Sequence, residues 1–417
     1  MNKTLDKNCQ MKDSEIEWIG KIPKGWEVRR FSSCISKSNA GEVIPKEFWG
    51  KGCELLYTCA KEPLFSNYEG FPEDKRTQKG NLLLTRNGTP YIHMPKLNSI
   101  YSNVVQRVIL EKDNSSFIRY TLIQGSKSII GNGDIIESFN MGKWNSTSIP
   151  LPPLYEQQAI ANYLDEQIEK IDELIAEQNQ AIENWKTYKQ SLITEKVTKG
   201  LNPGVDMKDS GIEWIGEIPK EWKVIKYKNI CNVFAGGTPK TDVQEYWDGD
   251  IPWIASGRVQ NCLITEPTRY ITNLGIINSS TKMLKRGTPV LAMTGATCGN
   301  AGFLEIDTCA NQSVMAFVPR KNDAFGKFIF YSLMAHRHVI LAEQFGGAQA
   351  GISTEKGRNL QITLPPLHEQ QAISNYLDEK CLKIDQMIEQ KQVFIKQLEE
   401  YKQSLIYECV TGKRCVL

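Results

Sequence analysis

Two long stretches of the chain carry apolar residues at alternating spacings of four and three. The first runs from Leu164 to Leu192 and the second from Leu377 to Leu405, with charged and amide residues over most of the positions between. This pattern predicts a heptad seam over about four repeats, which is typical of a coiled coil. Gly200 and Gly412 then suit helix C-terminal caps. The predicted seam residues are Leu164, Ile168, Ile171, Ile175, Gln178, Ile182 and Trp185 in the first stretch, and Leu377, Ile384, Ile388, Lys391, Ile395 and Leu398 in the second.

The two stretches are copies of one sequence. Residues 151–199, which begin LPPLYEQQAIANYLDE, match residues 364–412, which begin LPPLHEQQAISNYLDE, at 28 of 49 positions without a gap. A shorter block also recurs, as MKDSEIEWIGKIPKGWEV from Met11 and MKDSGIEWIGEIPKEWKV from Met207, with fourteen of eighteen positions identical. The chain is therefore a tandem duplication of a short motif, a variable region and a long helix.

A seam of this length needs a partner, and the other copy is the nearest one. Two like units in one chain favour a pseudo-two-fold arrangement, which makes the helices antiparallel. Gln178 and Lys391 occupy equivalent polar positions, where such a residue commonly sets the register. The alternative is that each helix packs only on its own domain. About forty helical residues make a rod of ~60 Å, long enough to hold two domains on major-groove faces of B-DNA ~34 Å apart.

The regions between the repeated blocks differ in sequence and length. Met11 lies 140 residues before Leu151, whereas Met207 lies 157 residues before Leu364. Short apolar runs, NLLLT (81–85), VVQRVIL (104–110), TPVLAMT (288–294) and SVMAFVP (313–319), predict strands. We therefore expect an α+β protein with two mixed α/β domains separated by two long antiparallel helices. The expected boundaries are 1–150 for the first domain, 151–200 for the central helix, 201–363 for the second domain and 364–417 for the last helix.

The composition is that of a soluble globular protein, and we expect the chain to stay in the cytoplasm. Of its 417 residues 41% are hydrophobic and 24% charged, and no apolar run has the ~18 residues that a membrane span needs. The eleven cysteines and four histidines lack metal-site spacing, so we expect reduced thiols and no metal. Segments 151–200 and 364–412 carry a net charge of −7, which leaves +9 on the rest of the chain. That sign suits nucleic acid.

The variable regions contain polar, glycine-rich loops in place of catalytic motifs. FAGGTPKT (234–241), TGATCGNAGF (294–303), LTRNGTPYIHMPK (84–96) and FNMGKWNSTS (139–148) mix cations, amides, hydroxyls and aromatics. Such side chains bind phosphates and base edges, although loops of this composition are more often plain turns. Phosphate-loop, nucleophile-elbow and zinc-protease motifs are absent from the sequence. Glu156 and Glu369 lie in first helical turns, where the helix dipole explains a carboxylate, so we assign no catalytic residue.

These blocks resemble the specificity subunits of type I restriction-modification systems. The likeness rests on WIGKIPKGW and WIGEIPKEW, the doubled LPPLxEQ helix, the YKQSLI endings and the GGTPKT, YWDGDIPW and NQSVMAFVP segments, and it covers essentially the whole chain. It implies two target recognition domains, each reading one half of a split DNA site. It also implies docking of two modification (methyltransferase) subunits and of restriction (motor-nuclease) subunits. Those partners would bind S-adenosylmethionine, ATP and magnesium, and this chain would bind no cofactor.

The resemblance also points to DNA-facing residues. GGTP and IPW segments are not visible between Val28 and Leu82, so the first domain departs from the pattern, and its loops are aligned through Gly88 and Gly295. Two rival functions remain: the recognition part of a fused restriction or methylation enzyme, and a coiled-coil scaffold that does not bind DNA. The implied DNA-facing residues are Arg86, Asn87, Thr89, Tyr91, His93, Lys143 and Asn145 in the first domain, and Thr238, Lys240, Thr241, Ser256, Arg258, Thr294 and Asn311 in the second.

Overall fold

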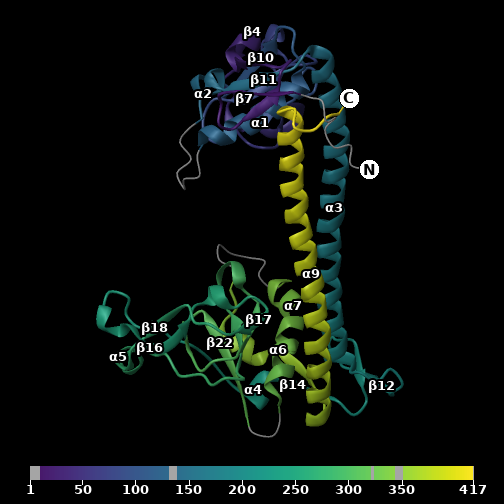
Figure 1. Ribbon diagram of the computed structural model, residues 1–417. Helices are drawn as coiled ribbons and strands as arrows, with labels where there is room; N and C mark the ends of the chain where they lie inside the picture. The colour runs from purple at the N-terminus through teal and green to yellow at the C-terminus, as the bar shows by residue number, and fades with distance from the viewer. Residues whose placement is uncertain (1–9, 131–138, 321–323, 343–350, 417) are drawn as a thin grey trace. The chain divides into compact units, whose positions relative to one another are not determined.

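The computed structural model describes residues 10–130, 139–320, 324–342 and 351–416, which form two compact units (Figure 1). Unit 1 comprises Met1–Gln178 and Gln392–Leu417, and unit 2 comprises Asn179–Lys391. Each unit therefore combines one variable region with part of both long helices, α3 (Leu154–Lys199) and α9 (Leu367–Val410).

Unit 1 is built on a four-stranded antiparallel sheet in the order β4-β10-β7-β8 and a three-stranded sheet in the order β6-β5-β9. Two small sheets, β1-β2 and β11-β3, complete it. The strands are β1 (Met11–Asp13), β2 (Lys21–Pro23), β3 (Glu27–Arg30), β4 (Ile35–Ala40), β5 (Trp49–Tyr57), β6 (Leu64–Ser66), β7 (Leu82–Thr85), β8 (Ile92–His93), β9 (Ile100–Tyr101), β10 (Val105–Leu110) and β11 (Ser148–Leu151). The helices are α1 (Ser115–Ile130) and α2 (Met141–Ser146), with 3-10 turns at Phe31–Cys34, Lys46–Phe48 and Glu73–Lys75.

Unit 2 repeats this plan with a five-stranded sheet, β15-β22-β19-β20-β17, and a three-stranded sheet, β18-β16-β21. The pairs β12-β13 and β14-β23 correspond to β1-β2 and β3-β11. The strands are β12 (Met207–Asp209), β13 (Glu217–Pro219), β14 (Lys223–Lys226), β15 (Cys231–Ala235), β16 (Trp247–Ile254), β17 (Cys262–Ile264), β18 (Arg269–Ile271), β19 (Pro289–Ala292), β20 (Ala301–Leu304), β21 (Cys309–Ala310), β22 (Val314–Pro319) and β23 (Gln361–Leu364). The helices are α4 (Tyr227–Ile230), α5 (Asn273–Ile277), α6 (Gly326–Ala335), α7 (Arg337–Ala342) and α8 (Thr354–Asn359), with 3-10 turns at Gln244–Tyr246, Ser256–Arg258 and Gly295–Thr297.

The strands predicted from apolar runs are confirmed, and they lack polar alternation because both of their faces are covered. Successive side chains of a strand point to opposite faces of the sheet. Leu82 and Leu84 pack in the same core as Phe117 of α1, whereas Leu83 packs with Leu56 of β5 on the other face. The central sheet of unit 1 is thus buried between a helix and a second sheet.

The repeated LPPLxEQ segment attaches the start of each long helix to its own unit. In unit 1 the Gln157 side chain accepts a hydrogen bond from the Asn114 backbone N–H (2.9 Å) and donates to the Pro152 carbonyl (3.0 Å). The indole Nε1 of Trp26 donates to Glu156 Oε2 (2.8 Å). Glu156 therefore has a specific hydrogen-bond donor in addition to the helix dipole that the sequence suggested.

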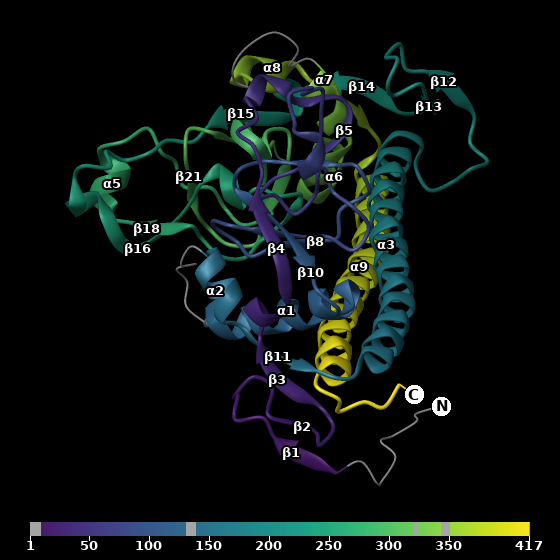
Figure 2. The same cartoon turned by 90° about the horizontal axis from the view of Figure 1, so that it is seen from above.

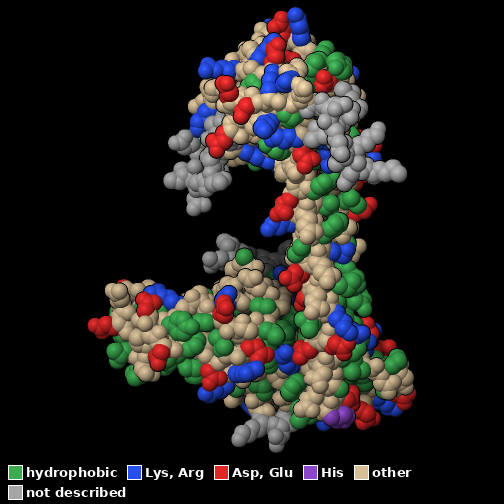
Figure 3. Space-filling model, viewed as in Figure 1, with side chains coloured by type: hydrophobic (Ala, Val, Ile, Leu, Met, Phe, Trp, Pro, Cys, Tyr) green, Lys and Arg blue, Asp and Glu red, His purple; other side chains and the backbone are tan. Residues whose placement is uncertain are grey.

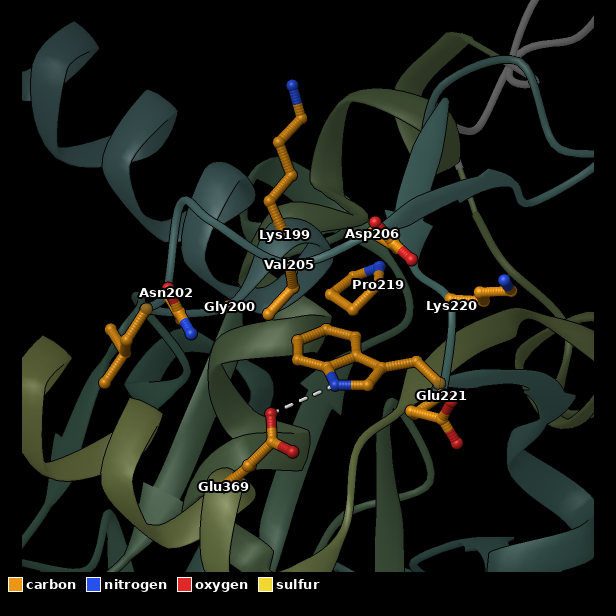
Figure 4. A pocket seen from close by; sticks show the side chains of 11 residues that line it. Lys199, Gly200, Asn202, Val205, Asp206, Pro219, Lys220, Glu221 and Glu369 are labelled. Carbon is orange, nitrogen blue, oxygen red and sulfur yellow. Dashed lines mark hydrogen bonds between the residues drawn. The ribbon is translucent and has the colours of Figure 1, made fainter.

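Unit 2 makes the same contacts with the second copy of the segment. Gln370 accepts from the Phe325 N–H (2.8 Å) and donates to the Pro365 carbonyl (2.9 Å). Trp222 Nε1 donates to Glu369 Oε2 (3.1 Å), beside an open pocket of about 370 Å³ into which Val205 and Pro219 also project (Figure 4). The LPPLxEQ segment thus occurs twice because each copy makes the same contacts with its own unit.

A tyrosine–aspartate pair strengthens each attachment about two turns further along the helix. Tyr120 Oη donates to Asp165 Oδ1, and Tyr331 Oη donates to Asp378 Oδ1, both at 2.6 Å. Burial, together with the adjacent carboxylate, raises the pKa of each phenol well above its usual value. Both tyrosines therefore remain hydrogen-bond donors at neutral pH.

The predicted antiparallel pairing of α3 with α9 is confirmed, and the two helices lie side by side (Figures 1 and 2). Lys402 Nζ contacts Asp172 Oδ1 (2.6 Å) in unit 1, and Lys189 Nζ contacts Asp385 Oδ2 (2.7 Å) in unit 2. Asp172 precedes Lys189 in α3, whereas the partner of Asp172, Lys402, follows the partner of Lys189, Asp385, in α9. This order is that of two antiparallel helices. The alternative was that each helix packs only on its own domain. This interpretation is incomplete, because in each unit one apolar core joins both helices to the sheet region.

The apolar seam residues are buried or half-buried, most of them in these cores, and the polar pair lies at half-buried positions. Gly200 and Gly412 adopt left-handed conformations (φ 77° and 68°), as predicted for helix caps. Gln178 and Lys391 have the intermediate exposure expected of polar seam residues, and their role in setting the register stays a prediction. Seam residues joined to the cores are Leu164, Ile168, Ile171, Ile175 and Leu398 in unit 1, and Trp185, Leu377, Ile384 and Ile388 in unit 2, while Ile182 is buried and Ile395 half-buried outside these clusters.

Candidate nucleic-acid interface

Antiparallel pairing brings the polar loops of unit 2 to one edge of its large sheet. Because neighbouring strands run in opposite directions, the end of β15, the start of β22, the end of β19 and the start of β20 share that edge. Backbone bonds tie the loops together: Gly236 N–H donates to Val314 O (2.9 Å), Gly237 N–H to Ala310 O (2.8 Å) and Met293 N–H to Ser313 O (2.8 Å). Three stretches far apart in the sequence thus form one continuous rim.

Glycine is required where the first of these loops meets the rim. A Cβ on Gly236 would lie 2.1 Å from the Ala310 carbonyl oxygen, well inside the contact distance of any real side chain. The GGTP sequence therefore allows two backbone segments to approach closely, and the side chains that follow, from Thr238 onward, are presented beside the β21–β22 turn.

The structure brings several predicted residues of unit 2 to this rim. Thr238 is half-buried and its hydroxyl donates to Gln312, while Thr294 is exposed in the β19–β20 loop. Asn311 is half-buried and its Oδ1 accepts from the Ser313 N–H (3.1 Å), so its side chain shapes the turn. Lys240 and Thr241 are exposed just beyond Thr238.

Ser256 and Arg258 belong to the neighbouring turn after β16. The Ser256 carbonyl accepts from the Thr297 hydroxyl (3.1 Å), which connects this turn to the β19–β20 loop. Arg258 is exposed, but its guanidinium contacts Glu266 Oε2 at 2.9 Å. Glu266 therefore partly balances the positive charge of Arg258, which attracts a phosphate less strongly than Lys240 does.

The same edge of the unit 1 sheet carries the predicted residues of the first region. Arg86, Asn87 and Thr89 lie in the β7–β8 loop, and the Arg86 Nη1 donates to the Asn103 carbonyl (3.0 Å). An open pocket of about 520 Å³ brings this loop together with the β9–β10 turn and the start of α2, and its lining residues are Arg86, Asn87, Asn103, Val104, Asn140, Met141 and Gly142.

The remaining predicted residues of unit 1 flank this pocket. Asn145 is exposed on α2, Lys143 is half-buried there, and the Asn140 side chain caps the helix by accepting from the Lys143 N–H (3.1 Å). Tyr91 is half-buried, and its backbone N–H donates to the Thr85 hydroxyl (3.0 Å). The two stretches that the sequence singled out, LTRNGTP and FNMGKWN, are thus neighbours in space.

His93 does not belong to this surface. It lies in β8 opposite Leu83, is only 9% exposed, and its ring faces Tyr57 with centroids 5.3 Å apart. Burial, with a smaller contribution from the positive charge of Arg119, lowers its pKa to about 4. The expectation that His93 contacts DNA is therefore corrected: the ring is a neutral core group.

The structure also reveals the unit 1 equivalent of the glycine loop, which sequence reasoning missed. A Cβ on Gly41 would lie 2.2 Å from the Tyr101 carbonyl oxygen, and the Gly41 N–H donates to Val105 O (3.1 Å), as Gly236 does to Val314. Ala40-Gly41 therefore corresponds to Ala235-Gly236. The signal that marks both copies is Ala-Gly, a nearby proline and then an aromatic–Trp pair, Phe48-Trp49 and Tyr246-Trp247.

The two tryptophans of that signal have the same role. Trp49 Nε1 donates to the Ile44 carbonyl (3.0 Å), and Trp247 Nε1 donates to the Lys240 carbonyl (3.1 Å). The strands that they begin, β5 and β16, both contain a register shift after the tryptophan and both pair parallel to the short strand before the rim. The first region thus contains structural equivalents of these elements, although its sequence lacks the GGTP and IPW motifs.

Charged side chains of both signs are dispersed over one face of the protein. On the face shown in Figure 3, Lys and Arg side chains are interspersed with Asp and Glu side chains over both units. Within residues 10–130, 139–320, 324–342 and 351–416, no group of three or more His, Cys, Asp or Glu side chains suits a metal ion. The free thiols there include Cys34, Cys53, Cys59, Cys231, Cys262, Cys309, Cys381 and Cys409. No helix of the described part combines the length and apolar character needed to cross a bilayer. Cys9 lies outside the described residues.

Comparison with known proteins gives the same picture. The type I restriction modification DNA specificity domain matches this chain twice, at residues 23–184 and 219–397. The EcoR124I/EcoR124II specificity subunit of Escherichia coli is 25% identical over 294 residues, 66% of each chain, and the inferred type I restriction enzyme MjaX specificity subunit of Methanocaldococcus jannaschii is 25% identical over 426 residues, 95% of each chain. A solved structure concerning complex assembly and conformational transition of the type I R-M system has the same fold, with a TM-score of 0.69 at 16% identity over 95% of this chain and 99% of that one. The chain belongs to the family of type I restriction-modification DNA specificity proteins.

Proposed function

We propose that this protein is the DNA sequence-recognition subunit of a type I restriction-modification complex, in which each unit reads one half of a bipartite site. The observation that carries the proposal is that the two units make the same contacts at the starts of the long helices but differ in the loops at the sheet edge. The Trp–Glu, Gln–backbone and Tyr–Asp contacts at the helix starts are the same in both units. The loops at the sheet edge occupy equivalent places and carry different side chains.

Difference at equivalent positions is what recognition of two unlike half-sites requires. At the β7–β8 loop of unit 1 the chain reads Arg86-Asn87-Gly88-Thr89, and at the β19–β20 loop of unit 2 it reads Met293-Thr294-Gly295-Ala296. Both glycines are left-handed (φ 76° and 75°), so the two loops share the backbone conformation at the glycine while the flanking side chains differ. Cations and hydroxyls in such loops contact phosphates, and amides and cations read base edges.

The exposed faces of the two helices support docking of two like modification subunits. Leu174 and Met387, which are equivalent in the repeat, are both exposed, and so are Tyr188 and Tyr401. Apolar side chains that recur in two copies suit a partner that is itself present in two copies. Methyl transfer and DNA cleavage belong in this proposal to the modification and restriction subunits, and the chain acts in the cytoplasm as a non-catalytic subunit.

Domain exchange tests the proposal. Residues 30–150 are replaced by the corresponding region of another family member, the complex with its modification subunits is purified, and its methylated sites are sequenced. One half of the bipartite site should change and the other should remain. A change in both halves, or in neither, would refute the modular reading.

The same complex separates the rival functions. A scaffold that does not bind DNA predicts no protected site even with the modification subunits present. The recognition part of a fused enzyme predicts methyl transfer by the purified chain alone, whereas a specificity subunit gives none without its partners.

The proposed spacer role of the helices has its own test. Removing four residues from α3 and the equivalent four from α9 shortens each helix by ~6 Å. The spacing between half-sites should shift or binding should be lost. Full binding with unchanged spacing would exclude the helices as the ruler.

A further inference from the structure

Two exposed amide residues occupy equivalent positions on the rims of the two units. In unit 1 the Ser102 N–H donates to the Tyr57 carbonyl, and in unit 2 the Asn311 N–H donates to the Ile254 carbonyl, both at 2.9 Å. The following bond also matches, since Val105 N–H donates to Ser102 O (2.9 Å) and Val314 N–H to Asn311 O (3.1 Å). The residue that follows Ser102 is Asn103, and the residue that follows Asn311 is Gln312.

In unit 1 the backbone of Asn103 is held on both sides while its side chain projects from the surface. The Asn103 N–H donates to the Glu42 carbonyl (2.8 Å), and its carbonyl accepts from Arg86 Nη1 (3.0 Å). Within the described ranges of the chain, its carboxamide makes no hydrogen bond. Asn103 lines the same pocket as Asn87 and Asn140, so it stands among other polar side chains at an open surface.

In unit 2 the orientation of the amide is set by its neighbour. Gln312 is exposed, and its carboxamide oxygen accepts a hydrogen bond from the Thr238 hydroxyl. This contact uses one of the two oxygen lone pairs and leaves the other, together with both N–H donors, for a ligand. Thr238 itself directly follows Gly236 and Gly237, whose backbone packs closely against the rim. The residue that orients the Gln312 amide is therefore held in place.

An amide group presents one donor and one acceptor side by side. Adenine alone among the bases shows the complementary pair, the N6 donor and the N7 acceptor, on its major-groove edge, and asparagine and glutamine bind it bidentately. A phosphate offers acceptors only and would not use the carbonyl oxygen of the amide. The chemistry therefore favours a base edge as the ligand of both residues.

We infer that Asn103 and Gln312 are specificity-determining residues, each of which reads an A·T base pair in the half-site bound by its own unit. The inference rests on the proposed function and adds residues and a base-pair type to it. Neither position was among the DNA-facing residues that the sequence indicated, because the turn before β10 carries no motif and only Asn311 was singled out in the NQSVMAFVP segment.

The test uses the full-length chain in complex with its modification subunits. Sites methylated by complexes carrying Asn103→Ala or Gln312→Ala are sequenced, and affinities are measured for duplexes in which each base pair of the wild-type site is changed in turn. The controls are Gln78→Ala and Asn229→Ala, exposed amides near the opposite ends of β7 and β15. Asn103→Ala should reduce discrimination at one A·T position of one half-site on the order of 10- to 100-fold, and Gln312→Ala should do so in the other half-site.

Three results would overturn the inference. Unchanged discrimination with either variant would exclude base reading by that residue. A uniform loss of affinity for all sequences, with a shallower salt dependence, would indicate phosphate contacts instead. Relaxation at a G·C position would refute the assigned base pair. Failure of the wild-type complex to select any bipartite site would instead refute the proposed function, so the two failures are distinguishable.

Discussion

Replacing Gly41 with alanine tests whether Gly41 of unit 1 has the same structural role as Gly236 of unit 2. The added Cβ would lie 2.2 Å from the Tyr101 carbonyl oxygen and 2.4 Å from that of Ser102, so the β9–β10 turn must move by about 1 Å. Overpacking of this kind costs about 3 kcal/mol, and weakening of the Gly41–Val105 backbone bond adds about 1 kcal/mol. Reduced freedom of the unfolded chain returns less than about 1 kcal/mol. The expected loss of stability is therefore about 3 kcal/mol.

Thermal unfolding of the full chain measures this loss, and hydrogen exchange locates it. In a unit of about 200 residues, a change of about 3 kcal/mol lowers Tm by ~6–12 °C. Protection should fall in β4, β9 and β10 of unit 1 and remain unchanged in unit 2. Gly25→Ala is the control, because no atom lies within 4 Å of its added Cβ. A Gly41→Ala protein with the Tm of this control would refute the close approach, and with it the correspondence to Gly236.

Three further outcomes follow from single contacts. Trp222→Phe removes the donor to Glu369 and should destabilise unit 2 by about 1–2 kcal/mol in urea unfolding, and an unchanged midpoint would show that the carboxylate needs no partner. Lys402→Gln should cost less than about 1 kcal/mol, and a double-mutant cycle with Asp172→Asn should give a coupling that vanishes in 1 M salt, because Asp172 is exposed and Lys402 only half-buried, so salt can screen the pair. His93 is neutral in the fold down to a pKa of about 4 but titrates near 6.5 when unfolded, so its contribution is complete above pH 6.5 and is lost as the pH falls toward 4. Its loss amounts to roughly 2 kcal/mol at pH 5, which His93→Phe should abolish; an identical pH profile for both proteins would contradict the neutral buried ring.

The long helices were predictable because their pattern extends over many turns and occurs twice. Heptad spacing, two prolines before the helix and a glycine after it all agree, and the structure begins α3 at Leu154 and ends it at Lys199. The partners of the repeated Glu and Gln were not predictable, because Trp26 and Asn114 reach Glu156 and Gln157 from distant parts of the chain.

The loops were predictable only where a local motif survives. Gly88 and Gly295 were aligned from sequence, and both have the left-handed conformation at equivalent ends of β7 and β19. Gly41 escaped because three residues, not two, separate it from the shared Pro-Lys pair and none of them matches GGTPKT, although the backbone contacts are the same. His93 was placed on the surface because β8 has only two residues, too few to show an alternating pattern.

The composition of unit 1 from two separate segments has a consequence for biosynthesis. Unit 2 is one continuous segment, Asn179–Lys391, and has all its residues once position 391 has left the ribosome. Unit 1 starts earlier but needs Leu398, Leu405 and Ile406 of α9 for its core, and these are made last. The domain whose synthesis begins first is thus the last to be completed, and until then its exposed apolar helix face is available to chaperones or to misassembly.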